Sequence, residues 1–303
     1  MSEMTQLQQA IQAAFPQTEL RMEEPLAQHT SFRIGGPCEV MAFPRSVEEL
    51  SRLLRWAHGR QLQPAILGSG TNVLAADARR RGLVICTRGC LDGLEQVDGV
   101  HIRVLAGVSM ARAAVFAANL GLSGLEFAHG IPGSVGGGLY MNAGAYGGEI
   151  RQVAVRTEFL DQEGIHHTLE GEEQGFGYRK SAFTGTSRVI VAGTFALTSG
   201  APEEIRQRMQ ELMARRKASQ PLDLPSAGST FKRPVGGYAA ALIEQAGLKG
   251  TQIGGAAVSA KHAGFVVNLG GATESDVLAL IAHVQKRVLE TSGISLEPEV
   301  VRL

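Results

Sequence analysis

The feature that most constrains the fold is a glycine-rich stretch in the middle of the chain, AHGIPGSVGGGLYMNAGAYGGEI, which runs from Ala128 to Ile150. Eight of its residues are glycine and most of the others are small. Glycine offers little surface for packing and loses more conformational entropy on folding than any other residue. The stretch therefore predicts that something large lies against nearly bare backbone. The alternative is a glycine-rich hairpin packed against a helix.

A second glycine loop, LGSGTNVL, follows a predicted buried strand about 60 residues earlier. It contributes two glycines and three side-chain donors: Gly68, Gly70, Ser69, Thr71 and Asn72. A turn with inward-facing N–H groups suits a pyrophosphate, although the spacing matches neither the P-loop nor the Rossmann fingerprint. Alone, this loop is equally consistent with a tight turn. Together, the two loops predict binding of a dinucleotide from two sides.

Composition narrows the class of protein. The 303 residues are 44% hydrophobic and 19% charged, which indicates a folded globular chain. Lys+Arg and Asp+Glu are both 29, which argues against nucleic-acid or membrane-surface partners. The cysteines Cys38, Cys86 and Cys90 form no C-x-x-C pair, so we expect neither a disulfide framework nor a metal site. Without a signal-peptide core or a membrane-length apolar run, the expected location is cytoplasmic.

Periodicity outlines the order of elements. A strand, a helix beginning near Ser46 and a second strand predict an α/β start. The segment 153–170 predicts a hairpin with its turn at DQEG. Around Ala201 the character changes, and a charged helix marks our candidate domain boundary. A later helix, from Glu274 to about Thr291, carries an apolar face of Val277, Leu280, Ile281, Val284 and Val288.

Seven segments carry a resemblance to a known family. They are HTSFRIGGP (29–37), LGSGTNVL (67–74), GIPGSVGGGLYMNAGAYG (130–147), YRKSAF (178–183), AGSTFKRP (227–234), LKGTQIGGAAVSAKHAGFVVN (248–268) and LEPEV (296–300). In this order they resemble UDP-N-acetylenolpyruvoylglucosamine reductases of the shorter, type II branch. The resemblance implies an α+β protein: an FAD-binding fold of the vanillyl-alcohol-oxidase (PCMH) type in two subdomains, plus a C-terminal α/β substrate domain.

On this basis we expect residues 1–200 to form the FAD-binding region, with subdomains of about 1–75 and 76–200. Residues 201–303 are expected to form the substrate domain, whose last strand returns to the first subdomain. The resemblance implies NADPH as co-substrate and non-covalent FAD, since GSGTNVLAADAR contains no histidine. It assigns FAD contacts to Gly68, Ser69, Gly70, Thr71, Asn72, Ile131, Pro132, Gly133, Ser134, Asn142, Gly144 and Ala145.

The implied reaction is the NADPH-dependent reduction, through FAD, of the enolpyruvyl group of a UDP-sugar to give UDP-N-acetylmuramate. Charge that builds on the enolate needs a cation, and the resemblance assigns that role to Arg179. It assigns Ser229 as proton donor, with Lys232 as a possible helper. Glu299 is the implied catalytic carboxyl, useful beside an anion if it is protonated. From the residues alone, Glu297 is an equal competitor.

The substrate carries a diphosphate, a sugar and a base, and the implied contacts are Tyr178, Lys217 and Lys232. Three features depart from the family pattern. Arg233 stands where many members have Asn, His129 precedes GIPG where small residues are commoner, and the segment between Phe183 and Arg188 is too short for a closing insertion. We expect His129 to fill space at the edge of the loop.

Two other functions stay open at this point. One is an FAD-linked oxidase of the same fold that acts on another alcohol or sugar. The other is a catalytically silent nucleotide-binding module. The residues that discriminate them from a reductase are Arg179, Ser229 and Glu299.

Overall fold

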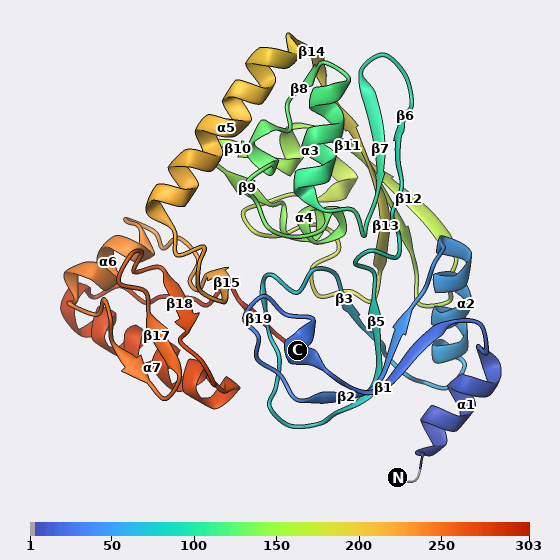
Figure 1. The fold of residues 1–303 in the computed structure, drawn as a ribbon, viewed down its shortest axis with the longest axis horizontal. Helices are drawn as coiled ribbons and strands as arrows, with labels where there is room; N and C mark the ends of the chain where they lie inside the picture. Colours follow the sequence, from blue (N-terminus) through green and yellow to red (C-terminus); the bar gives the residue numbers. More distant parts are fainter. Residues whose placement is uncertain (1–3) are drawn as a thin grey trace. The chain divides into compact units, whose positions relative to one another are not determined.

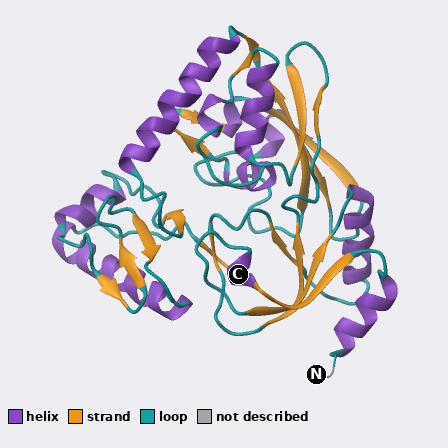
Figure 2. Ribbon diagram, viewed as in Figure 1, coloured by secondary structure: helices purple, strands orange, loops and turns teal. Residues whose placement is uncertain are grey.

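The computed structural model describes residues 4–303 and divides into two compact units. Among the described residues, unit 1 comprises residues 4–22, 39–69 and 81–215, and unit 2 comprises residues 23–38, 70–80 and 216–303. Figure 1 shows the elements of both units in chain order, and Figure 2 shows their mixed helix and strand content. The α+β character expected from the sequence is therefore present. We describe each unit by itself.

Each of four helices in unit 1 begins at a serine or threonine. They are α1 (Gln6–Ala14), α2 (Val47–His58), α3 (Met110–Asn119) and α4 (Val135–Met141). Their N-caps are Thr5, Ser46, Ser109 and Ser134, and each side chain accepts a hydrogen bond from a backbone N–H of the first turn. Such caps satisfy donors that the helix itself leaves open. The sequence predicted the start of α2 correctly.

The larger sheet of unit 1 has the order β12-β11-β13-β7-β6, with every neighbouring pair antiparallel. Its strands are β6 (Leu94–Gln96), β7 (His101–Leu105), β11 (Ala154–Leu160), β12 (His166–Glu170) and β13 (Val189–Ala196). The central strand β13 is buried along almost its whole length, and α4 packs against it. The predicted hairpin at DQEG is the β11–β12 pair.

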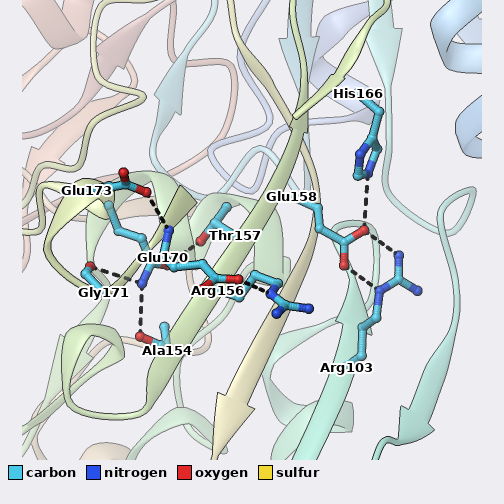
Figure 3. A network of polar contacts seen from close by, with 10 residues as sticks. Arg103, Ala154, Arg156, Thr157, Glu158, His166, Glu170, Gly171 and Glu173 are labelled. Carbon is cyan, nitrogen blue, oxygen red and sulfur yellow. Dashed lines mark hydrogen bonds and ion pairs between the residues drawn. The ribbon is translucent and has the colours of Figure 1, made fainter. Parts of the chain in front are cut away.

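A polar network runs across this sheet (Figure 3). Arg103 on β7 donates from Nε and Nη2 to both carboxylate oxygens of Glu158 on β11, at 2.5 and 2.8 Å. His166 on β12 lies 3.2 Å from the same carboxylate. Hydrogen bonding to Arg103 lowers the pKa of Glu158 below its usual range, and burial opposes that shift. The network ties three strands together through one half-buried carboxylate.

A second sheet has the order β1-β2-β5-β3, from β1 (Glu19–Pro25), β2 (Pro37–Phe43), β5 (Arg80–Cys86) and β3 (Ala65–Leu67). Strands β3 and β5 are parallel. Four short strands form two further pairs: β8 (Leu122–Ser123) with β14 (Thr198–Ser199), and β9 (Gly144–Ala145) with β10 (Gly148–Glu149). The β9–β10 hairpin lies within the glycine-rich stretch.

Unit 2 is built on the antiparallel sheet β15-β18-β17-β16. Its strands are β15 (Ser226–Ser229), β16 (Gln252–Ile253), β17 (Ala256–Val258) and β18 (Phe265–Asn268). Helix α7 (Glu274–Ser292) contacts β16 and β17, and the shorter α6 (Ala239–Gln245) contacts α7. All five residues of the predicted apolar face of α7 are buried.

Two segments from early in the chain complete unit 2. Phe32, Ile34 and Leu74 belong to the same apolar cluster as the buried face of α7. Strand β4 (Val73–Leu74) pairs in parallel with β19 (Val301–Arg302), so the end of the chain meets residues that the sequence analysis placed in the first subdomain. Only residues 301–302 of the predicted terminal strand form a regular pair.

Helix α5 (Pro202–Ser219) carries Ile205, Met209 and Leu212 as buried residues. The division between the units falls after Arg215, inside this helix. The domain edges at 75/76 and 200/201 follow a different criterion and stay a prediction. Among residues 4–303, no helix combines the length and apolarity that crossing a bilayer requires.

Candidate functional site

The predicted site residues are distributed over both units. Unit 1 holds Gly68, Ser69, Ile131, Pro132, Gly133, Ser134, Asn142, Gly144, Ala145, Tyr178 and Arg179. Unit 2 holds Gly70, Thr71, Asn72, Lys217, Ser229, Lys232 and Glu299.

The two glycine loops meet inside unit 1. A Cβ on Gly68 would lie 2.4 Å from Oγ of Ser134, a separation that real side chains do not reach. Ser134 is 2% exposed and caps α4, so it has no freedom to move aside. The first loop therefore needs glycine here because the second loop approaches it closely. The sequence analysis expected both loops to act together, and this contact places them against each other.

The glycine-rich stretch folds as helix α4 followed by the β9–β10 hairpin, and much of its glycine serves internal packing. A Cβ on Gly136 would lie 2.9 Å from that of Ala106, and one on Gly138 would lie 2.7 Å from Sδ of Met110. A Cβ on Gly148 would lie 2.5 Å from the ring of Phe127. The expectation that a large ligand explains the whole stretch is wrong for these positions, where the rest of the protein fills the space.

Several amides of the stretch are also used within the protein. Val135 donates to Val108, Gly136 donates to Ala106, and Ile131 donates to Ala128. These N–H groups are not available to a phosphate. A pyrophosphate contact must therefore come from other amides of the two loops and from side chains such as the half-buried Ser69.

The neighbourhood of the second loop nevertheless suits a bound cofactor. His129 follows the short 3-10 helix η2 (Glu126–Ala128), directly before the loop Ile131–Ser134. Its Nδ1 is buried and makes no hydrogen bond to any group in residues 4–303. A buried polar atom without a partner is costly, and such atoms often mark a place where a ligand binds. A Cβ on the exposed Gly137 would meet only Oγ of Ser134, at 3.5 Å.

Arg179 sits on a strained turn. Gly177 and Lys180 exchange backbone hydrogen bonds of 3.0 and 3.3 Å, which leaves Tyr178 and Arg179 as the two central residues. Arg179 has φ of 54°, in the left-handed region that a residue with a side chain seldom adopts. Its guanidinium donates to the carbonyl of Gly144 at 3.4 and 3.5 Å. Tyr178 is 54% exposed, and the Arg179 guanidinium lies 5.4 Å from its ring centroid.

The buried side chain of Asn142 connects the β9–β10 hairpin to the Arg179 turn. It ends α4 in the left-handed conformation and is 1% exposed. Its Nδ2 donates to Glu149 Oε2 at 2.9 Å and to the carbonyl of Gly177 at 3.0 Å, while Oδ1 accepts from the N–H of Arg151. Both amide donors are therefore used inside the protein. These contacts join the hairpin to the Arg179 turn, and the FAD contact expected of Asn142 stays a prediction.

In unit 2, Glu299 lies on an extended segment held from two sides. Its N–H donates to the carbonyl of Thr230 at 2.8 Å, and its carbonyl accepts from Nδ2 of Asn72 at 3.1 Å. The next residue but one, Val301, donates to the carbonyl of Asn72. Asn72 was predicted as a cofactor contact, and its side chain here supports the backbone of the predicted catalytic carboxyl.

The contacts also separate the two competing carboxyls. Lys232 Nζ forms an ion pair with Glu297, whose side chain is 71% exposed. Lys232 as a possible helper of Ser229 stays a prediction. Glu299 is half-buried, whereas Glu297 is exposed.

Ser229 ends β15 and is exposed, opposite Phe265 of β18. The neighbouring hydroxyl of Thr230 is buried and accepts a hydrogen bond from the N–H of Val266 at 3.0 Å. Because that hydroxyl is enclosed, Thr230 does not compete with Ser229 for a substrate.

The remaining predicted contacts lie on exposed parts of unit 2. Lys217, near the end of α5, is exposed, and its carbonyl accepts from Nζ of Lys261 at 2.6 Å. Arg233 stacks on the ring of Tyr238 at 4.0 Å. The sequence analysis missed Lys261 and Glu149 as supporting residues. Both stand inside motifs that it quoted or opened on, yet only the folded contacts reveal what they hold.

The cysteines carry no reactive thiol. Burial raises the pKa of Cys38 and of Cys90 to about 11, and it also raises that of Cys86. At neutral pH these side chains are protonated and behave as small apolar groups. Thiol chemistry therefore plays no part in this site.

Two family models match the chain. One for an FAD binding domain matches residues 38–170, and one for the UDP-N-acetylenolpyruvoylglucosamine reductase C-terminal domain matches residues 220–303. The UDP-N-acetylenolpyruvoylglucosamine reductase of Pediococcus pentosaceus is 44% identical over 97% of this chain and 97% of its own length. That of Levilactobacillus brevis is 46% identical over 96% of this chain and 95% of its own.

Solved structures agree with these matches. The UDP-N-acetylenolpyruvylglucosamine reductase of Thermus caldophilus superposes with a TM-score of 0.79 at 34% identity, over 94% of this chain and 98% of that one. An alkyldihydroxyacetonephosphate synthase superposes with a TM-score of 0.50 at 16% identity, over 66% of this chain and 42% of that one. The second likeness shows the fold alone, and it supports the expected PCMH-type FAD-binding architecture.

Proposed function

Because the chain belongs to the UDP-N-acetylenolpyruvoylglucosamine reductase family, as its near full-length identity to those enzymes establishes, we propose that it reduces UDP-N-acetylglucosamine enolpyruvate to UDP-N-acetylmuramate with NADPH. This reaction belongs to peptidoglycan precursor synthesis. The FAD binding domain makes the chain an FAD-dependent oxidoreductase. NADPH as co-substrate and the detailed roles below are part of the proposal.

FAD, when bound, carries reducing equivalents between the two substrates, which is chemistry that side chains alone do not supply. We propose that it is held by the two loops, through Gly68, Ser69, Gly70, Thr71, Asn72, Ile131, Pro132, Gly133, Ser134, Gly144 and Ala145. The unpartnered buried Nδ1 of His129 supports a polar ligand beside the second of these loops. Attachment is non-covalent, since the first loop contains no histidine.

Arg179 is the proposed partner of the developing enolate. A guanidinium stays charged at neutral pH and presents a rigid fork of donors that suits a carboxylate. Its link to the Gly144 carbonyl limits where the side chain can go, so that little reorganisation is needed when charge appears. The role requires a fixed cation, and the strained turn provides one.

Ser229 is the proposed proton donor, and Glu299 is the proposed carboxyl that accompanies it. A serine hydroxyl is a weak acid, so it must be aligned with the acceptor carbon and have its proton replaced. The exposed position of Ser229 at the end of β15 leaves its hydroxyl open to a substrate. Glu299 carries a proton in this proposal, because an ionised carboxylate would repel the enolate.

The UDP portion is proposed to contact Tyr178, Lys217 and Lys232. Tyr178 and Lys217 are exposed and therefore accessible to a substrate. Lys232 pairs with the exposed Glu297, and an exposed pair of this kind is weak enough to give way to a phosphate.

The observation that carries the proposal is the backbone of Arg179. A charged residue held at φ of 54° costs conformational energy, and strain of this kind clusters at functional sites. The general test is spectroscopic and kinetic. Purified protein given FAD is expected to show flavin absorbance and to sustain steady consumption of NADPH only when the enolpyruvyl substrate is present.

Two results would overturn the proposal. A protein that stays colourless after FAD is added is not a flavoenzyme of this kind. Oxygen-dependent turnover of a plain alcohol, without use of the enolpyruvyl substrate, would identify the FAD-linked oxidase instead.

A further inference from the structure

We infer that Asn142 is a positioning residue, whose side-chain amide fixes the turn Gly177–Lys180 and with it the Arg179 guanidinium. The inference rests on the proposed function of Arg179 and assigns Asn142 a role other than cofactor contact. All the residues involved belong to unit 1.

The backbone of Asn142 is itself specialised. It closes α4 with φ of 43° and ψ of 57°, a left-handed conformation that glycine and asparagine adopt most readily. At this position glycine would satisfy the backbone as well as asparagine does. The side chain is therefore free to serve a separate purpose, and its burial of 99% shows that this purpose lies inside the protein.

The side chain reaches both pieces of structure that surround Arg179. One hydrogen of Nδ2 goes to the carbonyl of Gly177, the first residue of the turn, at 3.0 Å. The other goes to Glu149 at 2.9 Å, and Glu149 is the register partner of Gly144 in the β9–β10 hairpin. The Gly144 carbonyl in turn accepts from the Arg179 guanidinium. Asn142 thus holds both the base of the turn and the strand that meets its charged tip.

The turn needs such an external support. Its own two backbone bonds join Gly177 and Lys180 but do not compensate the left-handed φ of Arg179. A non-glycine residue stays in that region only when the surrounding structure over-determines it. The Asn142 bond to Gly177 is a constraint that comes from outside the turn, from the end of a packed helix.

The test compares Asn142→Gly with a matched control. Asn142→Gly keeps the left-handed backbone and deletes only the amide. Gln61→Gly removes an exposed side chain from another left-handed residue of unit 1, at φ of 57°, and controls for the change in backbone freedom. Each variant is loaded with FAD. Flavin reduction by NADPH and flavin reoxidation by the enolpyruvyl substrate are then followed separately, together with FAD affinity.

Asn142→Gly is expected to slow reoxidation by the substrate about tenfold, as the loss of one buried positioning hydrogen bond would. Reduction by NADPH and FAD affinity are expected to change less than about twofold. Gln61→Gly is expected to leave all three unchanged. A merely structural role would instead lower all three together, and a cofactor contact would lower FAD affinity first.

A second readout needs no activity. Trypsin cleaves after Arg179 and Lys180, and it requires the chain to leave the turn. Without FAD, Asn142→Gly is expected to be cut at these two bonds at least about fivefold faster than the native protein, because local opening has become easier. Gln61→Gly serves again as the control.

The outcomes separate this inference from the proposed function. If the native protein reduces the substrate but Asn142→Gly shows unchanged reoxidation and unchanged cleavage, the positioning role is wrong. If the native protein does not reduce the substrate, the proposed function fails, and the cleavage measurement still decides whether Asn142 holds the turn.

Discussion

The Arg179 turn of unit 1 and the Glu299 segment of unit 2 present charged groups in opposite ways. Arg179 lies at left-handed φ in a turn whose end residues, Gly177 and Lys180, bond each other, and the carbonyl of Gly177 also accepts from Asn142. Glu299 lies on an extended backbone whose N–H and C=O are both bonded, to Thr230 and to Asn72. Arg179 lies on a strained turn that the side chain of Asn142 supports, whereas Glu299 lies on unstrained backbone that is paired as in a strand.

The difference teaches how stability and function are coupled at each place. Left-handed backbone costs roughly 1–2 kcal/mol for a residue with a side chain, so removing the Arg179 side chain relieves part of that cost. Extended backbone suits glutamate without strain, so glycine at position 299 would only increase the entropy lost on folding. We therefore expect that glycine in place of Arg179 lowers activity without lowering stability, whereas glycine in place of Glu299 lowers stability.

The largest expected effect is on the rate of flavin reoxidation, and it comes from substituting Ser229. Like Glu299, Ser229 lies on extended backbone in unit 2. Ser229→Ala is expected to slow reoxidation by the enolpyruvyl substrate by ~10²-fold or more, because the proton donor is lost. Flavin reduction by NADPH and thermal stability should stay near native values, since the hydroxyl is exposed. Rapid mixing of each half-reaction measures both. Equal rates for the variant and the native protein would rule out the assigned role.

The next effect concerns the hairpin that supports the turn. Gly148→Ala is expected to lower the free energy of unfolding by about 2 kcal/mol, because its Cβ would lie 2.5 Å from the buried ring of Phe127. Gly147→Ala is the matched control: it has φ of 87° and open space, so only backbone strain of about 1 kcal/mol is added. Chemical denaturation compares the two. A larger loss for Gly147→Ala would contradict the packing described.

A smaller effect tests whether stability alone explains activity. Glu158 has a lowered pKa in the folded state because it pairs with Arg103, so its contribution is present above the unfolded value near 4.3 and disappears as pH falls below it. Glu158→Gln is expected to lower the free energy of unfolding by about 1 kcal/mol at pH 7 and by less than that at pH 3. Denaturation at the two pH values checks this sign. Turnover by the variant should remain native, since the Arg179 turn is unaffected.

The smallest effect is expected for Glu297→Gln, and its comparison with Glu299→Gln distinguishes the two carboxyls of the terminal segment. Glu297→Gln removes only an exposed ion pair with Lys232 and is expected to change the free energy of unfolding by less than about 0.5 kcal/mol. Turnover should fall less than about twofold, whereas Glu299→Gln should lower it by ~10²-fold or more. Steady-state assays of both variants decide between them. A reversed order would exchange the roles of the two residues.

Much of the fold could be predicted from sequence because periodicity and capping are local. The buried face of α7, the cap Ser46 and the β11–β12 hairpin all depend on residues close together in the chain. Which segments of the chain make up unit 2 could not be predicted from local patterns. Phe32, Ile34 and Leu74 join its core through packing across long sequence separations, which periodicity does not encode.

In the candidate site, too, local motifs could be read from the sequence, but long-range contacts could not. Motifs located the glycine loops, but they did not reveal that Gly136, Gly138 and Gly148 pack against protein rather than ligand. Likewise, the supporting roles of Asn142 and Asn72 depend on partners that are 35 and 227 residues away. An asparagine in a glycine loop favours a ligand contact when only the sequence is read. The hydrogen bonds show that both side chains are used to hold backbone.

The most direct test of the account is the substitution Arg179→Gly, with Glu299→Gly as its counterpart. For each FAD-loaded variant, the free energy of unfolding and the rate of flavin reoxidation by the enolpyruvyl substrate are measured on the same preparation. Arg179→Gly should slow reoxidation by ~10²-fold or more while keeping or raising stability by up to about 1 kcal/mol, whereas Glu299→Gly should lose about 1 kcal/mol. Native reoxidation in Arg179→Gly, or a loss of stability as large as that of Glu299→Gly, would contradict the account.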